Sequence, residues 1–111
     1  AEPLYRHLLE DSAYRDTPKA FVPHNELAVW LIRKERYDDA LDELVRAKEL
    51  SENHPMIYLN LAILYDMHLN DPAKARGYYT KFLLVGEIKY PEQGEAVRRR
   101  LRTLTVPSPG G

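Results

Sequence analysis

The stretch YLNLAILY, from Tyr58 to Tyr65, decides how this chain folds, because it is apolar on two sides of a helix. At about 100° per residue, one side holds Tyr58, Leu61, Ala62 and Tyr65. The opposite side holds Met56, Asn60, Ile63 and Met67. A helix that is apolar on both sides is either buried all round, or it packs with one side and offers the other to a ligand.

The rest of the sequence also reads as helix, without the alternation that is typical of a strand. Four prolines suit a first helical turn, where the missing N–H costs nothing; they are Pro23, Pro55, Pro72 and Pro91. Asp71 can cap the helix that begins at Pro72, and Gly86 suits a helix end. We therefore predict an all-α chain with helices near 2–11, 23–35, 37–50, 55–69, 72–85 and 91–104.

The pattern in YLNLAILY has a second copy about 34 residues earlier in the chain. The matching pairs are Leu27 with Leu61, Ala28 with Ala62, and Leu31 with Tyr65. Further along, RYDDALDELVRAKEL corresponds to DPAKARGYYTKFLLV, with Ala40 matching Ala75. One residue is inserted around Asn70–Asp71. The chain therefore contains an internal helix-pair repeat.

This repeat resembles the tetratricopeptide repeat, with its W-x2-L-G-x2-Y and A-x3-F positions. Tyr58-x2-Leu61-Ala62-x2-Tyr65 and Ala75-x3-Tyr79 match it, as do His24-x2-Leu27-Ala28-x2-Leu31 and Ala40-x3-Leu44. Glu52 stands where the closing proline of the first repeat is expected. The resemblance, strong over 22–86, implies a right-handed superhelical array of antiparallel helix pairs, forming one domain over 1–105. Its parts are an N-terminal helix and linker (1–21), two full repeats (22–54 and 55–88), a capping helix (91–104) and a flexible tail (106–111).

Packing arguments agree with this arrangement. Helices can cross closely where side chains are small, which predicts crossings at Ala28, Ala40, Ala62 and Ala75. We expect aromatic side chains to fill the space between hairpins, namely Tyr58, Tyr65, Tyr79 and Phe82. On the capping helix Val97, Leu101 and Leu104 should face inward, and Arg98, Arg99, Arg100 and Arg102 outward. We also expect Gly77 to permit a close helix approach and Tyr78 to be exposed.

Composition excludes several classes of function. The 111 residues contain no cysteine, and the net charge is -1, which gives no general attraction to nucleic acid. The four histidines show no metal-ligand spacing and are expected at the surface or in turns; they are His7, His24, His54 and His68. No catalytic or nucleotide-binding motif occurs. We predict no enzyme, no metal, no cofactor and no membrane insertion. A cytoplasmic and a periplasmic or secreted location both fit the sequence.

The resemblance implies a concave face, lined by the first helix of each repeat, that binds a protein or peptide. Mapped by angle, this face holds Asn25, Val29, Arg33, Met56, Leu59, Asn60, Ile63, Met67 and Arg99, beside Val22, Glu26, Glu92 and Glu95. The predicted function is a non-enzymatic interaction or scaffold module for a peptide or a partner helix. One alternative is a structural or self-associating segment of a larger protein. A more remote alternative is a helical-repeat RNA binder.

Overall fold

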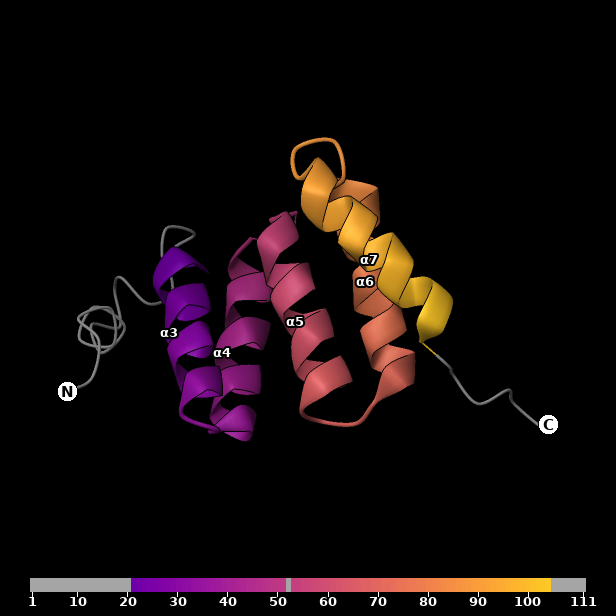
Figure 1. Cartoon of the computed structure of the whole chain (residues 1–111). Helices are drawn as coiled ribbons and strands as arrows, with labels where there is room; N and C mark the ends of the chain where they lie inside the picture. The colour runs from indigo at the N-terminus through magenta and orange to yellow at the C-terminus, as the bar shows by residue number, and fades with distance from the viewer. Residues whose placement is uncertain (1–20, 52, 105–111) are drawn as a thin grey trace. The chain divides into compact units, whose positions relative to one another are not determined.

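The computed structural model describes residues 21–51 and 53–104, and these residues form five α-helices without a strand (Figure 1). The helices are α3 (Phe21–Arg33), α4 (Tyr37–Leu50), α5 (Pro55–Met67), α6 (Pro72–Gly86) and α7 (Pro91–Thr103). The predicted all-α class is confirmed. The helix expected near 2–11, the tail at 106–111 and Glu52 lie outside the described residues.

Local sequence signals account for most helix limits. Pro55, Pro72 and Pro91 are each the first residue of their helix. Asp71 caps α6 as predicted, since its carboxylate Oδ1 accepts a hydrogen bond of 3.1 Å from the backbone N–H of Lys74. The differences from the predicted helix limits are at most two residues. Helix α3 begins two residues before Pro23 and, like α5, ends two residues earlier than expected.

The chain divides into two compact units, with the boundary between Asn53 and His54. In the first unit, α3 and α4 pack against each other as a hairpin. Its fully buried apolar residues are Leu27, Ala28, Leu31, Ala40, Leu44 and Ala47. The prediction of a surface or turn position is wrong for His24, which is 3 % exposed and hydrogen-bonded through Nδ1 to Oε2 of Glu43 on α4. A buried ring nitrogen requires such a partner.

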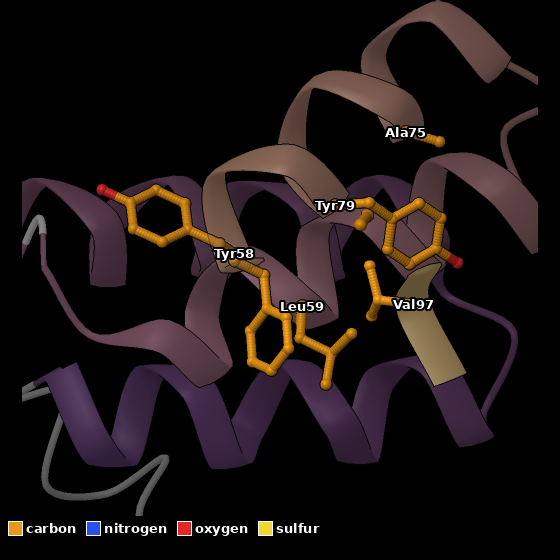
Figure 2. Packing of buried hydrophobic residues seen from close by; sticks show 7 residues of the cluster. Tyr58, Leu59, Ala75, Tyr79 and Val97 are labelled. Atoms are coloured by element: carbon orange, nitrogen blue, oxygen red, sulfur yellow. The ribbon is translucent and has the colours of Figure 1, made fainter. Parts of the chain in front are cut away.

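In the second unit, α5 packs along α6, and α7 packs against α6. Its core cluster contains Tyr58, Leu59, Ala62, Ala75, Tyr79, Phe82 and Val97 (Figure 2). Leu101 and Leu104 pack against this cluster, as predicted for the inner side of α7. Tyr78 is half-buried and not exposed as expected, because its ring stacks on Tyr65 with centroids 5.8 Å apart.

Two glycines in the second unit allow close packing, and neither is the glycine that we expected to do so. A Cβ added at Gly86 would lie 2.5 Å from Cβ of Pro55, so the end of α6 can meet the start of α5 only without a side chain. At Gly94, a Cβ would lie 3.2 Å from Cβ of Glu87. Gly77 is exposed and has no atom within 4 Å of such a Cβ, so its predicted role is wrong.

Candidate partner-binding groove

An apolar groove of about 260 Å³ lies between α5 and α7 in the second unit. Its lining consists of Leu59, Ile63, Met67, Tyr79, Gln93, Ala96, Val97 and Arg100. Leu59, Tyr79 and Val97 lie together at its buried side, as Figure 2 shows. Met67 is 57 % exposed. The groove is therefore an open apolar surface that continues directly into the core of the unit.

Helical periodicity explains how the two walls arise. Leu59, Ile63 and Met67 follow each other at intervals of four residues, so they share one side of α5. Ile63 and Met67 belong to the second apolar side described for YLNLAILY, and Leu59 borders that side. Helix α7 packs against α6 and supplies the other wall, where Ala96 is a small exposed side chain. A small residue at this position leaves space between the two helices.

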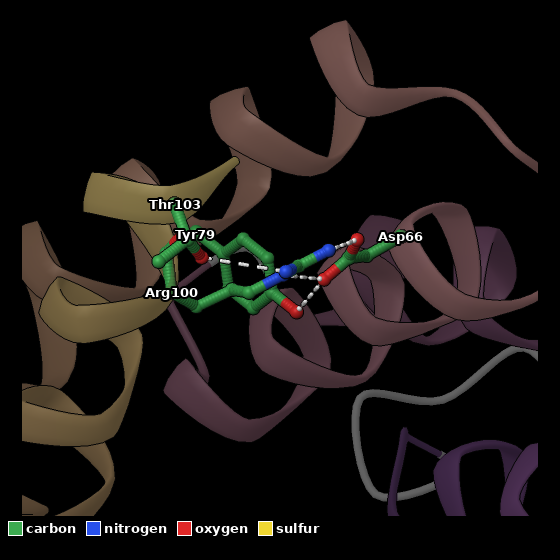
Figure 3. Close-up of polar contacts among 4 residues, drawn as sticks. All are labelled: Asp66, Tyr79, Arg100 and Thr103. Atoms are coloured by element: carbon green, nitrogen blue, oxygen red, sulfur yellow. Dashed lines mark hydrogen bonds and ion pairs between the residues drawn. The ribbon is translucent and has the colours of Figure 1, made fainter. Parts of the chain in front are cut away.

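Two of the groove residues, Tyr79 and Arg100, belong to a polar cluster around Asp66 (Figure 3). The guanidinium of Arg100 on α7 donates two hydrogen bonds to Asp66 on α5, from Nη2 to Oδ1 at 2.6 Å and from Nε to Oδ2 at 2.7 Å. The hydroxyl of Tyr79 on α6 donates a third to Oδ2 at 2.8 Å. The side chain of Asp66 is only 2 % exposed, while that of Arg100 is 39 % exposed. This two-pronged pair is the strong form of an ion pair, and it ties all three helices together.

The same contacts set the protonation of the cluster. Hydrogen bonding by Arg100 holds the pKa of the Asp66 carboxyl below its ordinary value, with a smaller contribution from Tyr79. Burial, followed by the hydrogen bond to Asp66, raises the pKa of the Tyr79 hydroxyl. The hydrogen bond to Asp66 also raises the pKa of Arg100. At neutral pH Asp66 is therefore ionised, Tyr79 is neutral, and the charge of Arg100 is locally compensated.

The predicted site residues fall into four groups. Leu59, Ile63 and Met67 come together in the groove. Met56 and Asn60 are half-buried on α5 outside its lining, and Met56 packs against the core. Arg99 is exposed on α7 but does not line the groove. The α3 residues of the prediction, Asn25, Val29 and Arg33, belong to the first unit.

Sequence reasoning missed part of the α7 wall. The residues proposed there, Glu92, Glu95 and Arg99, each precede a lining residue by one position, since Gln93, Ala96 and Arg100 form the wall. One position corresponds to a rotation of about 100°. Arg100 was also expected to face water with the other arginines, and that expectation is wrong because of its pairing with Asp66. The spacing of the inward residues could have identified this wall. Gln93 lies four residues before Val97, and Arg100 lies four residues before Leu104, so each shares a side of α7 with an inward residue.

The described part of the chain offers little for other chemistry. Within it, no group of three histidine or carboxylate side chains is placed to hold a metal ion. Burial, with a contribution from the charge of Lys89, lowers the pKa of His54. Of the helices in 21–51 and 53–104, none combines the length and apolar character needed to cross a membrane.

Comparison of the chain with protein-family models, with curated proteins and with solved structures finds no match.

Proposed function

We propose that this chain is a non-enzymatic protein-interaction module, and that the groove between α5 and α7 binds apolar side chains of a peptide or partner helix. The repeat of about 34 residues and its resemblance to the tetratricopeptide family support this proposal. The resemblance implies that α3 and α5 are the first helices of the two repeats, that α7 is the capping helix, and that the groove lies on the concave face.

The observation that carries the proposal is the character of the groove walls. Leu59, Ile63 and Val97 are apolar, Met67 is exposed, and Arg100 is neutralised by Asp66. Apolar surface left open to water at the edge of a core is typical of an interaction site. Methionine adapts to differently shaped partners because its side chain is unbranched. The walls therefore suit apolar anchors and offer no uncompensated charge to an acidic group.

The size of the groove narrows the kind of ligand. A volume of about 260 Å³ is below the roughly 300–1,000 Å³ that is typical of sites for drug-sized molecules. One or two side chains of an amphipathic helix match this space. Such helices dock through anchors at intervals of three or four residues.

The RNA-binding alternative receives less support. The positive charge that could attract RNA comes from the run of four arginines on α7. Two of these arginines are paired with carboxylates, Arg98 with Glu87 and Arg100 with Asp66. Tyrosines that could stack on bases are partly used in packing, since Tyr58 is 5 % exposed and lies in the core cluster. Phosphate binding depends on available cations, and exposed rings are needed for base stacking.

A selection of helical peptides displayed on phage, followed by affinity measurement with purified protein, tests the proposal. Ala96→Glu places a charged, longer side chain in the groove at an exposed position where helix propensity is retained. We expect selected peptides to lose at least about tenfold in affinity, equivalent to about 1.4 kcal/mol.

The matched control is Ala73→Glu, at an exposed position in the first turn of α6 outside the groove. It adds the same side chain and the same charge, so peptide affinity should stay unchanged. Selected peptides that bind both variants like the wild type would place the interaction on another surface.

A further inference from the structure

Arg100 has hydrogen-bond donors beyond those that its contacts with Asp66 and Thr103 use. A guanidinium carries five N–H groups. Asp66 accepts from two of them, one on Nε and one on Nη2, and Oγ1 of Thr103 accepts from Nη1 at 3.4 Å. Within residues 21–51 and 53–104 the guanidinium makes no further hydrogen bond. One N–H group on Nη1 and one on Nη2 therefore remain available to a ligand.

These two donors can be reached from the groove. Arg100 is one of the lining residues, and its side chain is 39 % exposed, whereas the side chain of Asp66 is almost completely buried. The Asp66 carboxylate occupies the edge of the guanidinium that Nε and Nη2 form (Figure 3). An acceptor that enters the groove therefore meets the unused N–H groups at the outer end of the guanidinium.

The donors lie at one end of the groove. Arg100 is bonded to Asp66, which directly precedes the lining residue Met67. Leu59 lies eight residues before Met67, or about 12 Å along α5. Helices α5 and α7 run in the same direction (Figure 1). The guanidinium therefore lies where both helices finish, and toward their start the lining residues carry no charge, with Gln93 as the polar one.

The state of Arg100 favours an uncharged oxygen as the acceptor. Its charge is balanced by Asp66, so the carboxylate of a ligand would be repelled by Asp66 and would lose its hydration in an apolar groove. The last four backbone carbonyls of a helix have no partner within that helix. They carry only the partial negative charge of the helix dipole. Such carbonyls match two free N–H groups on a compensated guanidinium.

We infer that Arg100 determines the direction in which a helix binds, because it donates hydrogen bonds to the C-terminal carbonyls of the bound helix. The ligand then runs in the same direction as α5 and α7, with its C-terminal end beside Met67. This inference rests on the proposed function and adds the orientation of the ligand. Asp66 is a positioning residue, since it fixes the guanidinium with two hydrogen bonds. A helix in the opposite direction would bring its own unpaired N–H groups to the guanidinium, donor against donor.

The two methionines of the chain can measure this direction. Met56 lies near the start of α5 and Met67 is its last residue, about 16 Å away along the helix. The probe is a helical peptide from the phage selection, with a nitroxide label at its C-terminal or at its N-terminal end. A nitroxide broadens the NMR signals of nearby nuclei. With carbon-13 in the methionine methyl groups, the C-terminal label should broaden Met67 more than Met56, and the N-terminal label should broaden Met56 more than Met67.

A substitution tests whether Arg100 is the cause. Arg100→Lys retains the positive charge beside Asp66 but lacks the rigid fork of N–H groups. Peptide affinity should fall at least about tenfold, and labels at both peptide ends should broaden Met67, because neither direction is then selected. Arg102→Lys is the matched control, at an exposed position of the same helix outside the groove, and should leave affinity and direction unchanged. Circular dichroism establishes that both variants are folded.

The wild-type label experiment does not depend on either variant. The reverse broadening pattern, or equal broadening of Met67 by both labels, would overturn the inference and leave the groove as the binding site. Binding of the peptide by Arg100→Lys with wild-type affinity and direction would also overturn it. If neither label broadened Met67 while the peptide was bound, the peptide would lie on another surface and the proposed function would fail as well. The two failures are therefore distinguishable.

Discussion

The turns inside the two hairpins have similar backbone geometry but very different residues. Between α3 and α4, Glu35 has φ of 61° and is followed by the N-cap residue Arg36. Between α5 and α6, Asn70 has φ of 52° and is followed by the N-cap residue Asp71. Each turn thus places one residue in the left-handed region directly before the helix cap. The second turn is one residue longer, as the inserted residue at Asn70–Asp71 predicted.

The second turn uses residues that favour its geometry, and the first does not. Asparagine tolerates the left-handed region, and the Asp71 carboxylate accepts a backbone hydrogen bond. Glutamate has no such tolerance, and the Arg36 side chain makes no capping hydrogen bond. The first turn is therefore held by the helices on either side of it, while the second is also stabilised locally. A similar turn can therefore form with residues that favour its geometry or without them, provided that the two helices pack together.

The largest expected effect concerns what the hairpins share, the completely buried alanines of their first helices. Leucine at Ala62 or at Ala28 should lower the free energy of unfolding by about 1–3 kcal/mol, because a close-packed site must move apart to accept it. Chemical denaturation measures this. Ala73→Leu, at an exposed site on α6, should stay within about 0.5 kcal/mol of the wild type. Tolerance of leucine at Ala62 but not at Ala28 would show that the hairpins are packed differently.

The next effect concerns the contact between Asp66 and Arg100 in the second unit. Asp66→Asn removes the carboxylate that Arg100 and Tyr79 share. It should cost about 1–3 kcal/mol at neutral pH, since a buried donor group loses its charged acceptor. Asp39→Asn affects an exposed ion pair with Arg36, in which the Asp39 side chain is 53 % exposed. This control should change stability by less than about 1 kcal/mol.

At acid pH, the wild type and Asp66→Asn should have the same free energy of unfolding. The pKa of Asp66 is lowered in the folded protein, so its contribution is complete above the unfolded-state pKa of about 3.9. The contribution of the Asp66 carboxylate to the free energy of unfolding decreases as pH falls below that value. It is lost once pH is below the folded-state pKa, because the carboxyl is then protonated in the folded and in the unfolded protein. Denaturation curves from neutral pH to below pH 4 measure this convergence. A difference that persisted in acid would mean that the ion pair is not its source.

The smallest effects concern the turns themselves, and they have opposite signs. Asp71→Ala should destabilise by about 0.5–2 kcal/mol through loss of the cap. Arg36→Asp should stabilise by a similar or smaller amount, because it supplies a cap that the first turn lacks, although it ends the exposed pairing with Asp39. Thermal unfolding of both variants provides the comparison. If both variants were destabilised, the residue at the N-cap position of the first turn would have another role.

The sequence predicted features that depend on neighbouring residues. Helix limits, the Asp71 cap and the inward side of α7 followed from proline positions, capping chemistry and periodicity. The pairing of Asp66 with Arg100 joins residues 34 positions apart, and Arg100 resembles the other arginines of its run. The wall of the groove was misplaced by one residue because the rotation of α7 depends on its packing against α6. His24 similarly looked polar in isolation, whereas its burial depends on Glu43 across the hairpin.

The binding groove can be tested most directly with the two methionines of the chain, Met56 and Met67. Labelling of their methyl groups with carbon-13 gives a two-signal spectrum in which Met67 reports on the groove and the half-buried Met56 serves as an internal control. On addition of a selected amphipathic peptide, the Met67 signal should move and the Met56 signal should stay. Movement of Met56 alone, or of neither signal when the peptide is bound, would contradict binding in the groove.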